Sequence, residues 1–355
     1  MKRESFGGPA TVCPAQQGYP RNCWYVAAFS TEVGRTLFRR RLLDEPVVLY
    51  RTEAGAPVAL ADRCPHRALP LSAGRLEGDA VRCMYHGMKF GADGRCQEVP
   101  SLGDAPPPRG LAVRSYPVLE RWKWIWIWMG DPAKADPALI PSDETMGLDR
   151  PGFTASTRFM CEMKANYQLL HENLLDTTHV TYLHPGGFDG GNAVSAAFKV
   201  EFFDQSVRLT REITEDRSPF VNRFFGTTGV AYHRLLITET FPPNLNVITN
   251  VVTDKADPSL VRMSVSPFPV TPGGPALCYQ FAATSLNFPW DVEAENAAFW
   301  KLFCQDRDVL EKIQKVFEEE GPDLPEFSVR ADQAAVWCRR KIFDMVRAEE
   351  PAAPQ

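Results

Sequence analysis

Two cysteines and two histidines between positions 64 and 86 constrain this chain more than any other feature of its sequence. Cys64 and His66 form a C-x-H pair, and after sixteen intervening residues Cys83 and His86 form a C-x-x-H pair. Four soft ligands in so short a segment predict a metal centre held between two loops. Structural zinc and an iron–sulfur cluster could both use this set of ligands.

The order of the ligands separates these two alternatives. A Cys2His2 zinc finger groups its ligands as a cysteine pair and a histidine pair. Here each loop carries one of each, which suits a Rieske 2Fe–2S centre, where two thiolates hold one iron and two imidazoles hold the other. Gly87 and the turn signal at Asp93-Gly94 indicate loops between short strands. The segment therefore predicts a Rieske cluster; buried cysteines with hydrogen-bonded histidines are the remaining alternative.

The composition fits two globular domains of ordinary size, with 355 residues, 44% of them hydrophobic and 23% charged. A net charge of −5 gives no electrostatic reason to expect binding to nucleic acid or to an anionic membrane. No stretch approaches the roughly 20 apolar residues that span a bilayer. The N-terminus lacks the apolar segment of a secretion signal, so we expect residues 1–17 to be a flexible arm of a cytoplasmic protein. Its nine cysteines should then be reduced.

The pattern of apolar residues predicts an α+β chain with two domains. Residues 18–130 contain short β-rich runs, as expected of an all-β cluster domain, and the Pro- and Asp-rich segment 130–144 is typical of a linker. Residues 131–355 open with a helix, continue with several strand-like runs and end with helices near 291–320 and 330–348. Strands in succession with helices at the margins predict an antiparallel sheet. No Gly-rich phosphate loop is present, so nicotinamide should bind a partner reductase.

A second metal site is indicated by "HENLLDTTHVTYLHPGG" (171–187), which we expect to form one helix ended by its Pro-Gly-Gly. Asn173, Asp176 and His179 are spaced three apart and would share one face, with His184 within reach. Two histidines and a distant carboxylate form the facial triad of non-haem Fe(II) oxygenases. Paired helical histidines can equally be structural, but a cluster that carries electrons needs an acceptor. His171 lies at the edge of this face, either beside the site or in ordinary packing.

The third ligand is expected to be Asp306. On a helical wheel this aspartate lies within an apolar stripe, whereas Asp308 points to the opposite, polar side. The stripe comprises Phe299, Leu302, Phe303, Leu310, Ile313 and Phe317. A carboxylate among such residues costs several kcal/mol unless it is paired or bound to a metal. An aspartate paired with a buried arginine is the alternative. His233 lies in a strand-like run, and nothing in the sequence assigns it a role.

Residues 18–345 as a whole resemble the oxygenase components of the Rieske non-haem iron monooxygenases. The resemblance is strongest to the homotrimeric group that contains vanillate O-demethylase, dicamba O-demethylase and toluenesulfonate methyl-monooxygenase. It rests on the cluster loops and on "RNCWYVAAF", "WIWMGDP", "NLLDTTHVTYLHP", "YQFAATSLNF" and "QDRDVLE".

The resemblance implies a role for each site residue. The cluster would be bound by Cys64, His66, Cys83 and His86, and the mononuclear iron by His179, His184 and Asp306. Asp176 would connect an iron-ligand histidine to a cluster histidine of the neighbouring subunit, and Asn173 would lie beside the iron. The C-terminal domain would form a helix-grip sheet around the substrate. His171 departs from the apolar residue expected of the family at its position.

The resemblance also implies the reaction and the partners. The chain would be the terminal oxygenase of a monooxygenase that oxidises a small aromatic acid with O2, by O-demethylation or methyl hydroxylation. Electrons would come from NAD(P)H through a ferredoxin, a flavin reductase or both. Ring hydroxylation or cis-dihydroxylation, as in phthalate-type relatives, is the alternative reaction. A Rieske electron carrier is a more distant alternative, because it would not require Asp306 in an apolar stripe.

Overall fold

The computed structural model describes residues 18–350 except 189–190, 290 and 322–323. The expected arm, residues 1–17, lies outside the described residues. The chain forms two compact units. One consists of Arg21–Ile140 together with Thr271–Gly274, and the other contains the remainder of the described chain.

The unit formed by Arg21–Ile140 is built from three small antiparallel sheets. The first contains β1 (Trp24–Phe29), β11 (Trp124–Trp128) and β10 (Val118–Arg121). The second contains β2 (Phe38–Leu42), β3 (Glu45–Arg51), β4 (Pro57–Ala61) and β9 (Ser115–Tyr116). The third contains β5 (Arg75–Glu77), β6 (Ala80–Arg82), β7 (Lys89–Phe90) and β8 (Cys96–Glu98). Cys64 follows β4 and Cys83 follows β6, so both predicted ligand loops begin where a strand ends.

The second unit is organised around one seven-stranded sheet in the order β12-β18-β17-β16-β15-β14-β13. The strands are β12 (Thr154–Met163), β13 (Phe198–Phe202), β14 (Val207–Asp216), β15 (Tyr232–Phe241), β16 (Leu245–Asp254), β17 (Val261–Gly274) and β18 (Leu277–Leu286). Burial alternates strictly along β15, which is the signature of a strand with one covered and one open face. The predicted α+β class with an antiparallel sheet is confirmed.

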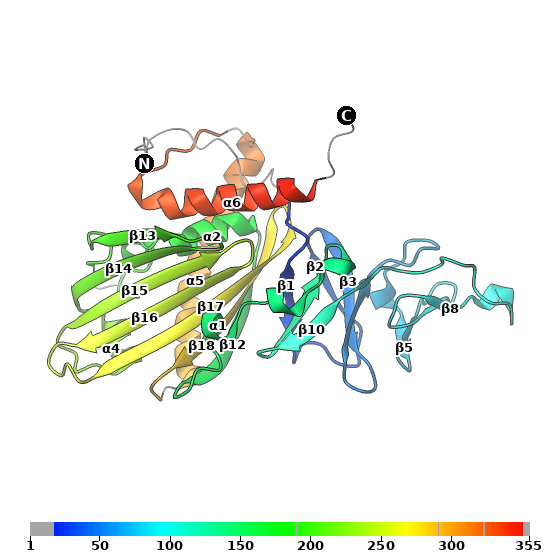
Figure 1. The fold of residues 1–355 in the computed structure, drawn as a ribbon, viewed down its shortest axis with the longest axis horizontal. Helices are drawn as coiled ribbons and strands as arrows, with labels where there is room; N and C mark the ends of the chain where they lie inside the picture. Colours follow the sequence, from blue (N-terminus) through cyan, green and yellow to red (C-terminus); the bar gives the residue numbers. More distant parts are fainter. Residues whose placement is uncertain (1–17, 189–190, 290, 322–323, 351–355) are drawn as a thin grey trace. The chain divides into compact units, whose positions relative to one another are not determined.

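Helices cover one face of this sheet (Figure 1). They are α2 (Tyr167–Leu175), α3 (His179–Leu183), α4 (Pro219–Phe225), α5 (Val292–Glu320) and α6 (Gln333–Glu349). The long α5 runs along the sheet, and its apolar residues pack with those of α4, β15 and β18. The segment 130–144 holds two 3-10 turns, Pro132–Lys134 and Pro137–Leu139, and the start of α1 (Asp143–Met146).

The segment 171–187 differs from the single helix that its sequence predicts. The chain leaves the helical conformation at Asp176, which has extended backbone angles, and a new short helix begins at His179. The Asp176 carboxylate accepts hydrogen bonds from the backbone N–H (2.8 Å) and the hydroxyl (2.5 Å) of Thr178. Aspartate side chains compete with helical bonding in this way. The helical wheel that placed Asn173, Asp176 and His179 on one face is therefore wrong for this segment.

The helical phase predicted for α5 is confirmed at its centre and fails towards its end. Asp306 is buried and Asp308 is exposed, as the apolar stripe requires. Ile313, which the wheel places in the stripe, is exposed. The buried residue here is Gln314, whose side-chain oxygen accepts a hydrogen bond from the backbone N–H of Asn166 at 2.9 Å.

His171 belongs to a buried hydrogen-bonded chain that ties α2 to the sheet. Its Nε2 donates to the carbonyl of Pro243 at 2.9 Å. Its Nδ1 accepts from the amide of Asn246 at 2.9 Å, because the oxygen of that amide already accepts from the Thr240 hydroxyl at 2.6 Å. Burial lowers the pKa of His171 more than these bonds raise it, so the imidazole is neutral. Of the two expectations for His171, ordinary packing is the one the structure supports.

We expect His171→Leu to lower the free energy of unfolding by about 3 kcal/mol, because it leaves a buried amide and a buried carbonyl without a partner. The loss should shrink as the pH falls. The folded pKa lies below the unfolded value of about 6.5, so the unfolded wild type binds a proton first and the stabilisation decreases below that pH. Urea unfolding at pH 7.5 and pH 5.5 measures both effects. His233→Leu is the control, since His233 contacts Glu212 on the open face of the sheet; an equal loss there would contradict the interpretation.

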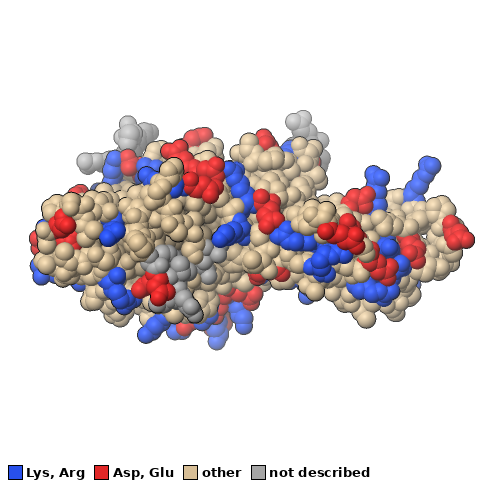
Figure 2. Space-filling view, turned by 90° about the horizontal axis from the view of Figure 1, so that it is seen from below, with Lys and Arg blue, Asp and Glu red and all other residues tan. Residues whose placement is uncertain are grey.

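On the face shown in Figure 2, Lys and Arg lie interspersed with Asp and Glu, without a large field of one sign. Within the described part of the chain, no helix is long and apolar enough to cross a membrane.

Candidate metal centres

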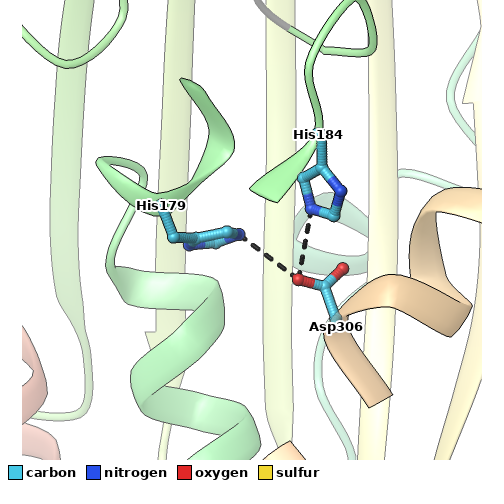
Figure 3. Close-up of side chains that lie close together, drawn as sticks. All are labelled: His179, His184 and Asp306. Atoms are coloured by element: carbon cyan, nitrogen blue, oxygen red, sulfur yellow. Dashed lines mark hydrogen bonds and ion pairs between the residues drawn. The ribbon is translucent and has the colours of Figure 1, made fainter. Parts of the chain in front are cut away.

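Three side chains from two elements converge in the second unit (Figure 3). His179 begins α3, His184 directly follows it, and Asp306 lies near the middle of α5. The Nε2 atoms of the two histidines lie 3.4 Å and 3.2 Å from one carboxylate oxygen of Asp306. The ligand atoms all lie within 4.8 Å of one another, which is the arrangement that one metal ion requires.

The other nitrogen of each imidazole is held by an oxygen acceptor. Nδ1 of His179 donates to the backbone carbonyl of Asp176, and Nδ1 of His184 donates to the side-chain oxygen of Gln305 at 2.8 Å. With the proton on Nδ1, the lone pair of each Nε2 points towards the Asp306 carboxylate. Lone pairs that face one another call for a cation between them, and metal-binding histidines are oriented by bonds of this kind.

The charge of Asp306 suits a metal ligand. Burial favours its neutral form, yet the imidazoles of His179 and His184 hold the pKa of the carboxyl below its ordinary value when each Nε2 carries a proton in the place of the metal. Burial also lowers the pKa of His184, but the nearby Asp306 carboxylate raises it overall. Two imidazoles and one carboxylate form the facial triad that leaves coordination positions open for O2 and substrate. The residues therefore fit a mononuclear iron.

Asn173 and Asp176 both lie close to this triad. The Asn173 amide donates to Asp306 at 3.1 Å, so it contacts the same carboxylate oxygen as the histidines. Asp176 contacts His179 through its backbone carbonyl, while its carboxylate holds Thr178. Gln305 was not predicted from the sequence, because an amide beside an aspartate carries no spacing signal of its own.

The two loops of the first unit share one backbone geometry. In the first loop the backbone N–H of Cys64 donates to the carbonyl of Leu69, and the N–H of Ala68 donates to the carbonyl of Cys64. In the second loop the N–H of Cys83 donates to the carbonyl of Met88, and the N–H of Gly87 donates to the carbonyl of Cys83. The fifth residue of each loop has positive φ, +58° at Ala68 and +73° at Gly87. A Cβ on Gly87 would lie only 2.9 Å from Pro100, so glycine is required there.

The side chains of these loops fit a two-iron cluster. Cys64 and Cys83 are buried, whereas His66 and His86 are exposed, with ring centroids 4.5 Å apart. Burial raises the pKa of the Cys64 thiol, and the neighbouring Cys83 raises it further. Two thiolates can coexist in such a place only with a metal to neutralise them. One inner iron on sulfur and one outer iron on imidazole would satisfy all four ligands.

Comparisons with known proteins agree with both centres. Residues 23–117 match the Rieske [2Fe-2S] domain, and residues 163–348 match the vanillate O-demethylase oxygenase C-terminal domain. The chain belongs to the Rieske non-haem iron oxygenases. It is 34% identical to the iron–sulfur subunit of a toluene-4-sulfonate monooxygenase system from Comamonas testosteroni, over 93% of this chain and 97% of that protein.

Two further relatives extend this agreement. The oxygenase component of dicamba O-demethylase from Stenotrophomonas maltophilia is 32% identical, over 93% of this chain and 99% of that protein. The crystal structure of dicamba monooxygenase bound to 3,6-dichlorosalicylic acid superposes with a TM-score of 0.82 at 29% identity, covering 94% of this chain and 99% of that one. The cofactors of this oxygenase are accordingly a Rieske 2Fe–2S cluster and a mononuclear non-haem iron.

A cavity of about 110 Å³ adjoins the triad of the oxygenase. His179, His184 and Asp306 form part of its wall. Most of the remaining wall is apolar and rich in phenylalanine: Phe188, Phe220, Phe224, Phe268, Phe299 and Phe303. An engineered cavity of about 150 Å³ binds benzene, so this space is the size of a single aromatic ring at most. No motif marks these residues, since they are scattered over two helices, a strand and a loop. His233 is not among the residues that line it.

Proposed function

We propose that this oxygenase is the terminal component of a monooxygenase that removes an O-methyl group from, or hydroxylates a methyl group of, a small aromatic acid. The observation that carries the proposal is the phenylalanine-lined cavity of single-ring size that contains the predicted iron ligands in its wall. The names of relatives support it: one is a toluene-4-sulfonate monooxygenase subunit and two are O-demethylase oxygenases.

The chain's own residues perform the positioning in this reaction. The iron, when bound, supplies activation of O2, and the cluster supplies electrons. His179, His184 and Asp306 would hold the metal on one side only. The amide of Asn173 would fix the carboxylate of Asp306. The phenylalanine wall would exclude water and orient the ring. For a methoxy substrate, O2, two electrons and two protons yield the phenol, formaldehyde and one water.

The test is a product assay on the complete system. Oxygenase, NADH and a ferredoxin or flavin reductase are incubated with methoxylated or methylated aromatic acids. We expect formaldehyde from the former, an alcohol from the latter, and uptake of about one O2 per product. Ring-hydroxylated or dihydrodiol products would instead establish the alternative reaction, and the absence of any oxidised product would refute the proposal.

The residue assignments and cellular setting belong to the same proposal. Cys64, His66, Cys83 and His86 would bind the cluster, and His179, His184 and Asp306 the iron. A ferredoxin, a flavin reductase or both would deliver electrons in the cytoplasm. The buried thiols and the outward-facing histidines support this, because they would leave the imidazole side of the cluster accessible to a donor.

We further propose a homotrimer in which electrons pass from the cluster of one chain to the iron of the next. A head-to-tail ring can bring such sites together, and Asp176, which contacts His179, would connect them.

Two inactive variants, Cys64→Ser and His179→Ala, are co-expressed. Transfer between chains would restore activity at about a quarter of the junctions under random equal mixing. Adding Asp176→Asn to the Cys64→Ser chain should abolish it. Mixed trimers that retain both centres but stay inactive would contradict the proposal.

A further inference from the structure

The cavity beside the triad contains one buried guanidinium, that of Arg234 on β15, which is only 4% exposed. Two of its nitrogens are held by the protein. Nε donates to the side-chain oxygen of Asn250 at 2.9 Å, and Nη1 donates to the backbone carbonyl of Phe188. Among the described residues nothing accepts from Nη2. An arginine that is fixed at two nitrogens and lines a cavity leaves its third nitrogen to serve a ligand.

Two hydroxyl groups on the same wall add to this donor set. Asn250 donates to the Ser264 hydroxyl at 3.3 Å, and that hydroxyl has no acceptor for its own hydrogen within the described chain. The Thr238 hydroxyl, on the same face of β15 with Leu236 between it and Arg234, is fully buried and has no hydrogen-bond partner in the described structure. Buried polar groups are nearly always satisfied, so these groups indicate a missing acceptor.

Arg234 forms a long ion pair with one buried carboxylate. The Asp216 carboxylate lies 3.5 Å from Nη1, which is longer than the 2.7–2.9 Å typical of a charge-assisted hydrogen bond. The other charged residue in the cavity wall is Asp306, whose charge a metal would neutralise. The cavity therefore offers one cationic group with a free donor, and the rest of its wall is mainly aromatic.

We propose that Arg234 binds the anionic group of the substrate, a carboxylate or a sulfonate, and thereby selects aromatic acids over neutral aromatics. This inference rests on the proposed function and identifies the residue that sets its substrate class. Nη2 donates to one oxygen of the anion, and the Ser264 or Thr238 hydroxyl donates to another. The ring then occupies the phenylalanine-lined part of the cavity, which also contains the metal ligands.

The test measures binding rather than turnover. Two pairs of probes match in shape and differ in charge: 4-methylbenzenesulfonate with its sulfonamide, and 4-methoxybenzoate with its amide. Calorimetry on anaerobic holoenzyme should show that the wild type binds each acid more tightly than its amide. Arg234→Met should weaken binding of the acids about 100-fold, as expected for loss of one partner of a buried charge pair, and leave binding of the amides nearly unchanged. Arg234→Lys, which keeps the charge but not the planar fork, should fall in between.

Controls separate recognition from folding. Arg208→Met removes an arginine of the neighbouring strand β14 that pairs with Glu239 at 2.6 Å outside the cavity, and it should leave the preference for acids intact. If Arg234→Met does not fold because Asp216 has lost its ion-pair partner, the double variant Arg234→Met/Asp216→Asn replaces it. The double variant should likewise bind the acids more weakly and leave binding of the amides nearly unchanged.

Three outcomes would overturn the inference: wild-type protein that binds acid and amide equally, wild-type protein that binds neither acid, or an Arg234→Met variant that weakens both members of a pair alike. The proposed function is tested separately by its products. Oxidation of a neutral methoxy or methyl aromatic by a wild type without preference for acids would overturn the role of Arg234 and leave the demethylase or hydroxylase chemistry standing.

Discussion

Asp306→Ala should remove the mononuclear iron and abolish substrate oxidation while the visible spectrum of the cluster is unchanged. The substitution leaves two imidazoles, too few to form a facial triad. It also removes the carboxylate oxygen that lies 3.4 Å and 3.2 Å from the two Nε2 atoms. The iron content should fall from about three to about two per chain, with acid-labile sulfide constant. Iron and sulfide analysis and visible absorption spectra of anaerobically purified protein measure these quantities.

Asp308→Ala is the matched control, because it removes an aspartate from the same helix two residues away. Asp308 is exposed and pairs with the adjacent Arg307 at 3.0 Å, outside the site. This variant should keep about three irons per chain and full activity. Loss of iron from Asp308→Ala and its retention in Asp306→Ala would show that the assignment of the third ligand is wrong. Zinc in place of iron in the wild type would refute the whole site.

The residues brought together at the triad were predictable because each carried a signal of its own. Asp306 was selected by its place in an apolar stripe, and the structure buries it. His179 and His184 were selected by type and spacing, although they do not lie on the single helix that the sequence predicts. The Asp176 carboxylate accepts a hydrogen bond from Thr178, and the helix ends there. Because the helix ends, the backbone carbonyl of Asp176 accepts a hydrogen bond from His179. A local side-chain bond of this kind overrides helical periodicity.

The cavity could not be predicted, for a reason that is also physical. Arg234 lies on the covered face of β15. The alternating pattern of this strand predicts only that one of its faces is covered. Whether such a residue is a core ion pair or a ligand-binding group depends on which nitrogens its neighbours occupy. Asn250 and Phe188, which occupy two of them, come from another strand and from the loop after α3. Gln305 was missed for the same reason, since its partner His184 lies 121 positions away in the chain.

Cys83→Ala should eliminate the cluster and all activity, whereas Cys96→Ala should retain both. The two thiols lie in the same domain, Cys83 within an apolar core and the half-buried Cys96 packed against that core. They differ in surroundings. Cys83 begins a loop that matches the Cys64 loop bond for bond, and its thiol raises the pKa of Cys64. Cys96 lies in β8, where its thiol donates to the carbonyl of Glu98 at 3.3 Å.

The reason for so large a difference is that a cluster cannot remain on one thiolate. Without Cys83 the inner iron would lose one of two sulfur ligands from the protein. The visible absorption and the acid-labile sulfide should then disappear, and iron should fall to about one per chain, which is the mononuclear ion. The unfolding temperature of the domain should also fall, because a ligand that binds only the folded state stabilises it. Absorption, sulfide assay and calorimetry on both variants measure these effects. A Cys83→Ala protein that keeps its cluster, or a Cys96→Ala protein that loses it, would show that the ligand loops are wrongly assigned.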